Sequence, residues 1–171
     1  VFADANVRGH VGVLEFARRL PRLEHLVYAS SSSVYGRNNK LPFAETDPVE
    51  QPGSFYAVSK RSAELASATY SYLYGIPQTG LRLFTVYGPW GRPDMAYYSF
   101  ARAITQGRPV TLYEGRALPR DFTYIADVVS AVLAVCDKPP HGGPDRVFHV
   151  GSQAPQSVRT LIDVLEEGLE T

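Results

Sequence analysis

The fold is decided by residues 26–36, which read LVYASSSSVYG. The first part of this segment, from Leu26 to Ser30, is short, apolar and partly β-branched, which is typical of a strand buried on both faces of a parallel sheet. Ser30 to Ser33 then lie at the carboxyl end of that strand, where open α/β sheets bind their ligands. These hydroxyls mark a candidate site, although the same run also suits a turn or a set of helix caps.

A second candidate site segment is YAVSK, residues 56–60, inside a helix that the pattern predicts over residues 55–74. Tyr56 and Lys60 are four residues apart, so both side chains emerge on one face of this helix. A neighbouring ammonium favours the phenolate, which makes Tyr56 a candidate general base. Taken alone, this spacing is more typical of a solvated helix face.

Outside these two segments, apolar runs alternate with helical patterns. Further strands are predicted at 81–86, 110–113, 121–125 and 147–150, and further helices at 1–20, 95–106, 127–136 and from 157 onward. Strands that alternate with helices predict an α/β fold with a mostly parallel sheet.

Composition narrows the classes of function. The 171 residues carry 17 Lys plus Arg and 17 Asp plus Glu, so the formal net charge is zero, and we expect neither nucleic acid nor a membrane surface as a partner. Cys136 is the only cysteine, which excludes an internal disulfide and a multi-cysteine metal site, and no metal is expected. No apolar run approaches the roughly 18 residues of a membrane helix. A reducing, cytoplasmic setting fits these features.

Five segments, taken together, resemble the extended short-chain dehydrogenase/reductase superfamily and, within it, the nucleotide-sugar epimerases, most closely those of UDP-glucuronate. The segments are Asn6–Gly9, Ala29–Gly36, Tyr56–Lys60, Leu81–Ala96 and Arg120–Ile125. The resemblance implies the C-terminal part of a Rossmann-like, doubly wound parallel sheet plus part of a small substrate-binding subdomain. Residues 1–93 would form the second part of the NAD-binding Rossmann domain and carry the catalytic Ser, Tyr and Lys. Residues 94–171 would mainly form the nucleotide-sugar-binding part, interleaved with the last Rossmann elements.

The resemblance also implies a cofactor, NAD, and the groups that work beside it. NAD would take a hydride from C4 of the sugar and return it to the opposite face, so that no net redox change occurs. Tyr56 would remove the proton of the 4-hydroxyl, Lys60 would hold the nicotinamide ribose, and Ser31 would hydrogen-bond the same hydroxyl. Leu83 would join Tyr56 and Lys60 as a cofactor contact.

Ser32 and Ser33 would contact the substrate, and they distinguish the chain from related enzymes. Sugar 4,6-dehydratases carry Asp-Glu at these positions because eliminating water needs an extra acid and base. UDP-glucuronate decarboxylases tend to place a Glu at the second position. Serine hydroxyls cannot replace those carboxyl groups, so the remaining chemistry is reversible oxidation without elimination.

The resemblance assigns recognition of the UDP-sugar to five residues. Thr85, where galactose epimerases usually carry Asn, and Arg92 would hold the C6 carboxylate of a uronic acid through charge-assisted hydrogen bonds. Arg120 would grip the diphosphate, and Thr111 and Tyr113 would flank the uracil. Two alternatives stay open, since Arg92 also suits a solvated loop and Tyr113 also suits core packing. Such a substrate points to carbohydrate metabolism and polysaccharide biosynthesis.

Two features depart from the family pattern. His149 stands where the family usually has Asn before Gly151. None of the 14 glycines forms the G-x-G pair of a dinucleotide-binding turn, and the sequence opens at Val1 without an initiator Met. We therefore expect part of a longer enzyme, without its N-terminal NAD-binding portion, that has little or no activity alone and is a homodimer when complete.

Other functions remain open. The complete enzyme could be a UDP-glucose/UDP-galactose 4-epimerase or another NAD-dependent sugar-nucleotide dehydratase. A non-catalytic homologue kept for binding belongs to a different class of function. The intact Ser31, Tyr56 and Lys60 argue against this last alternative, because a protein that only binds has no physical need for all three.

Overall fold

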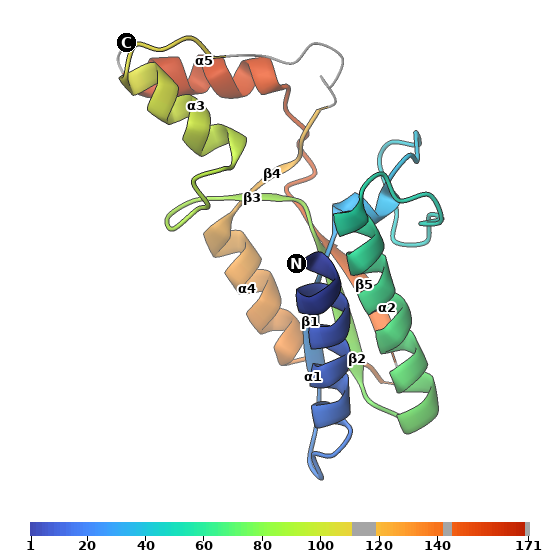
Figure 1. Ribbon diagram of the computed structural model, residues 1–171. Coiled ribbons are helices and arrows are strands. Elements are labelled where there is room, and N and C mark those ends of the chain that lie inside the picture. Colours follow the sequence, from blue (N-terminus) through green and yellow to red (C-terminus); the bar gives the residue numbers. More distant parts are fainter. Residues whose placement is uncertain (111–118, 142–144, 170–171) are drawn as a thin grey trace. The chain divides into compact units, whose positions relative to one another are not determined.

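A computed structural model describes residues 1–110, 119–141 and 145–169 of the chain (Figure 1). The chain forms two compact units. The first comprises Val1–Phe84 and Val129–Val150, and the second comprises Thr85–Val128 and Gly151–Thr171. The described part of the first unit contains every predicted catalytic residue.

The first unit is built around a three-stranded parallel sheet in the order β1-β2-β5. Its strands are β1 (Leu26–Ser31), β2 (Gln78–Leu83) and β5 (Asp145–Val150). In the ladder, Ser31 lies opposite Leu83, and Leu83 lies opposite Val150. The three carboxyl ends therefore meet at one edge of the sheet, which confirms the predicted parallel α/β organisation.

The prediction of one strand over residues 81–86 was wrong at both ends. β2 already begins at Gln78, whose side-chain amide donates hydrogen bonds of 2.9 Å to the Ser67 carbonyl and the Ser71 hydroxyl. Gln78 and Thr79 at the start of β2 are fully buried, but they are polar, so the pattern of apolar residues did not reveal them. β2 ends at Leu83, and the separate strand β3 (Thr85–Tyr87) pairs with β4 (Phe122–Tyr124) instead.

Helix α2 (Phe55–Tyr74) carries Tyr56 and Lys60 and has the predicted bounds. At its start, the Ser54 hydroxyl accepts a hydrogen bond of 3.1 Å from the backbone N–H of Ala57. At its end, Gly75 adopts a left-handed conformation with φ of 67°. Local capping thus fixes which residues are helical, and tertiary contacts fix which face is buried.

The predicted helix over residues 1–20 consists of a π-helical turn, η1 (Ala3–Arg8), continued by α1 (Gly9–Ala17). This helical segment lies beside α2 (Figure 1). Three side-chain hydrogen bonds join the two, namely Asn6 to Ser59 at 3.0 Å, His10 to Ser67 at 2.7 Å and Tyr70 to Glu15 at 2.6 Å. These contacts hold α2, the helix that carries Tyr56 and Lys60, against the η1–α1 segment.

In the second unit, β3 and β4 form a two-stranded parallel sheet. Helices α3 (Ala96–Thr105) and α5 (Val158–Gly168) belong to the same unit and fall within the predicted helices. α4 (Ile125–Cys136) runs across the division between the units. The strand predicted at 110–113 is absent at Val110, and its other residues lie outside the described part of the chain.

Gly36 closes the short 3-10 helix η2 (Ser32–Tyr35) that follows β1, and the fold requires a glycine there. Its φ is 55°, and a Cβ on this residue would lie 2.0 Å from the carbonyl oxygen of Gln51. Gly75 also has a positive φ, but nothing lies within 4 Å of the place that a Cβ would take there. A comparison of the two glycines therefore distinguishes the cost of a positive φ, which both share, from the cost of a steric collision, which arises only at Gly36.

We predict that Gly36→Ala destabilises the protein more than Gly75→Ala does. A positive φ costs alanine about 1–2 kcal/mol at either position. Collision with the Gln51 carbonyl adds about 1–3 kcal/mol at position 36 alone. Urea unfolding of both variants measures the difference, and equal destabilisation would contradict the described turn.

Candidate functional site

Ser31 is the last residue of β1 and the N-cap of η2, which sets the position of its hydroxyl. Its Oγ accepts a hydrogen bond of 3.2 Å from the backbone N–H of Ser33 and donates one of 3.1 Å to the Ser33 Oγ. Ser31 is 9% exposed, whereas Ser33 is exposed and Ser32 is half-buried. Ser31 thus caps a short helix, and it does so at the carboxyl edge of the sheet, where open α/β sheets bind their ligands.

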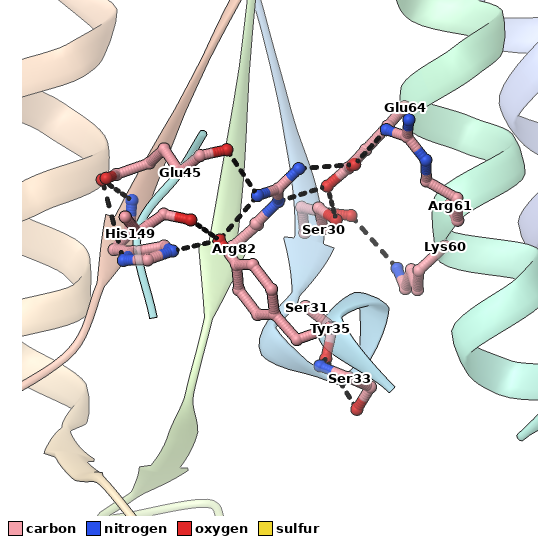
Figure 2. A network of polar contacts seen from close by, with 12 residues as sticks. Ser30, Ser31, Ser33, Tyr35, Glu45, Lys60, Arg61, Glu64, Arg82 and His149 are labelled. Carbon is pink, nitrogen blue, oxygen red and sulfur yellow. Dashed lines mark hydrogen bonds and ion pairs between the residues drawn. The ribbon is translucent and has the colours of Figure 1, made fainter. Parts of the chain in front are cut away.

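Lys60 and Tyr56 share one face of α2, as their spacing predicted. The Lys60 Nζ lies 5.9 Å from the centroid of the Tyr56 ring. The same Nζ donates a hydrogen bond of 3.2 Å to the carbonyl oxygen of Ala29, two residues before Ser31 (Figure 2). Burial lowers the pKa of Lys60 from its ordinary value. The lysine therefore links the Tyr56 face of the helix to the carboxyl end of β1.

A buried ion pair, which sequence reasoning missed, lies next to these groups. Arg82 of β2 donates from Nε to Glu64 Oε1 at 2.9 Å and from Nη2 to Glu64 Oε2 at 3.0 Å. Both residues are only 3% exposed. Glu64 also accepts hydrogen bonds from Ser30 at 2.6 Å and from Arg61 at 2.9 Å. Figure 2 shows this carboxylate at the junction of β1, β2 and α2.

Opposing effects act on this ion pair. Burial disfavours the charged carboxylate of Glu64, but hydrogen bonds from Arg82 and Ser30 outweigh it and lower the pKa of Glu64. Burial likewise disfavours the Arg82 cation, but its contacts with Glu64 prevail and raise the pKa of Arg82. Both groups therefore remain charged around neutral pH, and each depends on the other for compensation.

Arg82 also contacts the phenol of Tyr35, the last residue of η2. The Arg82 Nη1 donates to the Tyr35 hydroxyl at 2.6 Å and to the Glu45 carbonyl at 3.1 Å. The Tyr35 hydroxyl also lies 2.9 Å from the Ala44 carbonyl and 2.5 Å from His149 Nε2. His149, which departs from the family pattern, thus belongs to this polar network and joins it from β5 (Figure 2).

Several groups determine the charge of His149. Burial is the main cause that lowers the pKa of His149, and the cation of Arg82 acts in the same direction. The carboxylates of Glu45 and Asp47 act in the opposite direction but do not prevail. His149 is therefore mainly neutral at neutral pH.

The described substrate-binding candidates of the second unit are Thr85, Arg92 and Arg120. Thr85 begins β3, and its backbone N–H donates to the Asp121 carbonyl at 3.0 Å. Arg92 is exposed and forms an ion pair with Asp94, in which Nε lies 3.0 Å from Oδ1. Arg120 is exposed and its backbone pairs with that of Gln156. Thr111 and Tyr113 lie outside the described residues.

Asp121 is a further residue whose role sequence reasoning missed. Its Oδ1 accepts from the backbone N–H and the hydroxyl of Ser152, at 2.7 and 2.9 Å. Its Oδ2 accepts from the backbone N–H of Gln153 at 2.7 Å, a residue with φ of 59°. The carboxylate thus anchors the turn that follows β5. Because Asp121 comes directly after Arg120 in the sequence, the same contacts also hold the backbone that carries this arginine.

Two further observations concern the described residues. No helix among them is long and apolar enough to cross a membrane. Residues 1–110, 119–141 and 145–169 also contain no cluster of three or more His, Cys, Asp or Glu side chains that could hold a metal ion. The predicted catalytic residues at the sheet edge offer a hydroxyl, a phenol and an ammonium.

Comparison with known protein families matches residues 1–151 to the NAD dependent epimerase/dehydratase family. The chain belongs to this family. UDP-glucuronate 4-epimerase 1 of Arabidopsis thaliana is 45% identical over 182 residues, which cover 99% of this chain and 42% of that protein. The chain spans about half the length of the curated relatives it matches, or less.

Solved structures give the same fold. UDP-glucuronic acid 4-epimerase from Bacillus cereus, in complex with UDP-glucuronic acid and NAD, has a TM-score of 0.89 at 30% identity and covers 99% of this chain and 52% of its own. A UDP-galactose 4-epimerase has a TM-score of 0.86 at 28% identity and covers 99% of this chain and 56% of its own. These likenesses confirm the Rossmann-like α/β fold predicted from the sequence.

Proposed function

We propose that the complete protein is a nucleotide-sugar 4-epimerase that interconverts UDP-glucuronate and UDP-galacturonate. Its main support is that Lys60 lies over the Tyr56 ring and reaches the end of β1 two residues before Ser31. Family membership and the 45% identity with a UDP-glucuronate 4-epimerase support the same proposal.

Each catalytic side chain has a distinct task in this proposal. Tyr56 removes the proton of the sugar 4-hydroxyl as general base. Lys60 holds a positive charge over the ring, which stabilises negative charge that develops on the phenol oxygen. Ser31, whose hydroxyl is oriented by the backbone of Ser33, hydrogen-bonds the 4-hydroxyl and aligns it for proton transfer.

The residues at the sheet edge fit NAD. The Lys60 ammonium donates one hydrogen bond within the described residues, to Ala29, so its other N–H groups can serve ribose hydroxyls. Leu83 ends β2 beside Ser31 and offers an apolar surface at the same edge. NAD, when bound, supplies the hydride acceptor and donor for C4 of the sugar. We assign its remaining contacts to parts of the enzyme outside these 171 residues.

The proposed substrate contacts are those that the family resemblance implies. Arg92 and Thr85 bind the C6 carboxylate of the uronic acid, Arg120 binds the diphosphate, and Thr111 and Tyr113 flank the uracil. Ser32 and Ser33 contact the sugar without supplying the carboxyl groups that elimination needs. One observation favours a neutral sugar instead, since Asp94 already pairs with the Arg92 guanidinium. A UDP-galactose epimerase is therefore the second candidate.

The proposal also covers the roles of the two parts of the chain, its cellular location and its oligomeric state. Residues 1–93 serve catalysis and residues 94–171 mainly bind the nucleotide sugar, in a cytoplasmic homodimer. Large apolar side chains that are exposed just before η1 and on α1 and α2 support a subunit interface there, because an apolar patch on a surface marks an interaction site. They include Phe2, Val13, Phe16, Leu65 and Leu73.

We predict that Tyr56→Phe in the complete enzyme lowers kcat by about 100-fold or more, because the general base is lost. Conversion of UDP-glucuronate, followed by chromatography of the two UDP-sugars, measures the loss. UDP binding should change by less than about twofold, since the ring remains. Tyr72→Phe is the matched control, because this tyrosine lies on the same helix and is 83% exposed. Normal turnover by Tyr56→Phe would end the proposed mechanism.

We predict that Arg92→Ala lowers the ratio of kcat/KM for UDP-glucuronate to that for UDP-glucose by about 10- to 100-fold, the value of a charged hydrogen bond. Parallel assays with the two substrates give the ratio directly. Arg102→Ala is the control, an exposed arginine of the same unit on α3. A ratio that Arg92→Ala leaves unchanged would favour the UDP-galactose epimerase.

A further inference from the structure

The Tyr35 hydroxyl is a buried junction of the polar network (Figure 2). Tyr35 is only 1% exposed, and its ring stacks on Phe43 with centroids 4.3 Å apart. Its hydroxyl contacts Arg82, Ala44 and His149 at 2.6, 2.9 and 2.5 Å. Two strands, β2 and β5, and the loop that holds Ala44 therefore converge on one oxygen at the carboxyl edge of the sheet.

Donor and acceptor counts explain why this oxygen is well fixed. A phenol has one hydrogen to donate and two lone pairs that accept. The hydrogen goes to the Ala44 carbonyl, and the lone pairs accept from Arg82 Nη1 and His149 Nε2. A neutral His149 then carries its proton on Nε2, and its Nδ1 faces Glu45 Oε1 at 3.7 Å. The full hydrogen-bonding capacity of the phenol is used.

Tyr35 is joined to Ser31 by a single tight turn. Ser31 caps the start of η2 and Tyr35 ends it. Between them, the backbone N–H of Ser33 donates to Ser31 Oγ at 3.2 Å, and the Ser33 carbonyl accepts from the N–H of Gly36 at 3.1 Å. In so short a turn, a shift of Tyr35 moves Ser33 and with it the orientation of the Ser31 hydroxyl.

We propose that Tyr35 is a positioning residue for Ser31, and that Arg82 and His149 hold its hydroxyl in place. Tyr35 is too buried to touch the substrate, so it acts only through the turn that it closes. The inference rests on the proposed role of Ser31 as a hydrogen-bonding partner of the sugar 4-hydroxyl. It assigns the network a task beyond stabilising the fold, namely setting the geometry of proton transfer.

The test uses Tyr35→Phe in the complete enzyme, which removes the oxygen and keeps the stacked ring. We expect kcat for UDP-glucuronate to fall by about 10- to 100-fold, because small misplacements of reacting groups have effects of this size. KM and UDP binding should stay within about twofold. Tyr28→Phe is the matched control: Tyr28 is also buried on β1, and its hydroxyl bonds Ser67 rather than η2. This control should keep kcat.

A double-mutant cycle with Ser31→Ala separates this inference from the proposed function. If Tyr35 acts through Ser31, Tyr35→Phe should lower kcat by less than about twofold in the Ser31→Ala background. Independent, multiplicative losses would overturn the inference, as would a normal kcat for Tyr35→Phe alone. If Ser31→Ala itself turned over normally, the proposed role of Ser31 would fall instead, and the inference with it.

A second pair of variants keeps the proposal testable if Tyr35→Phe does not fold. The side-chain amide of His149→Gln can still donate a hydrogen bond to the Tyr35 hydroxyl, whereas His149→Leu cannot. We expect Gln to keep kcat within about threefold and Leu to lower it by about tenfold, at unchanged KM. Equal kcat values for the two variants would contradict the proposed positioning.

Discussion

The buried ion pair between Arg82 and Glu64 is the interaction on which the site depends. Two charges between a sheet and a helix lose their hydration, so each requires the other for compensation. The planar guanidinium of Arg82 binds both carboxylate oxygens of Glu64, and this bidentate contact restricts their relative orientation. Arg82 belongs to the central strand, and Glu64 lies one helical turn after Lys60 on α2. The pair therefore fixes the position of α2 against the sheet at the level of the predicted catalytic residues.

The same pair fixes the chain on both sides of Ser31. Glu64 binds the side chain of Ser30, immediately before Ser31, and Arg82 binds Tyr35 at the end of the turn that Ser31 caps. Lys60 completes the arrangement through the Ala29 carbonyl. The catalytic groups proposed here thus sit on rigid elements, supported by a layer of buried polar contacts rather than by apolar packing alone.

The sequence predicted those parts of the structure whose cause is local. The bounds of α2 follow from a serine cap and a terminal glycine, and the shared face of Tyr56 and Lys60 follows from helical spacing. The ion pair was missed because charged residues are normally exposed, and its partners come from different elements, 18 residues apart. One signal was available, an arginine between Leu81 and Leu83 in an apolar run, which can be buried only if a carboxylate meets it.

Exchanging the ion pair for an apolar pair, Arg82→Met with Glu64→Leu in the complete enzyme, tests this dependence most directly. Arg82→Met alone removes the bidentate partner of a buried carboxylate, which keeps only its contacts with Arg61 and Ser30, and costs about 3–5 kcal/mol, whereas the double exchange is often neutral for stability. We predict that the double variant regains stability in urea unfolding but has a kcat about 100-fold below that of the parent enzyme, because Ser31 is no longer held. Full turnover by a stably folded double variant would contradict a positioning role for the charges.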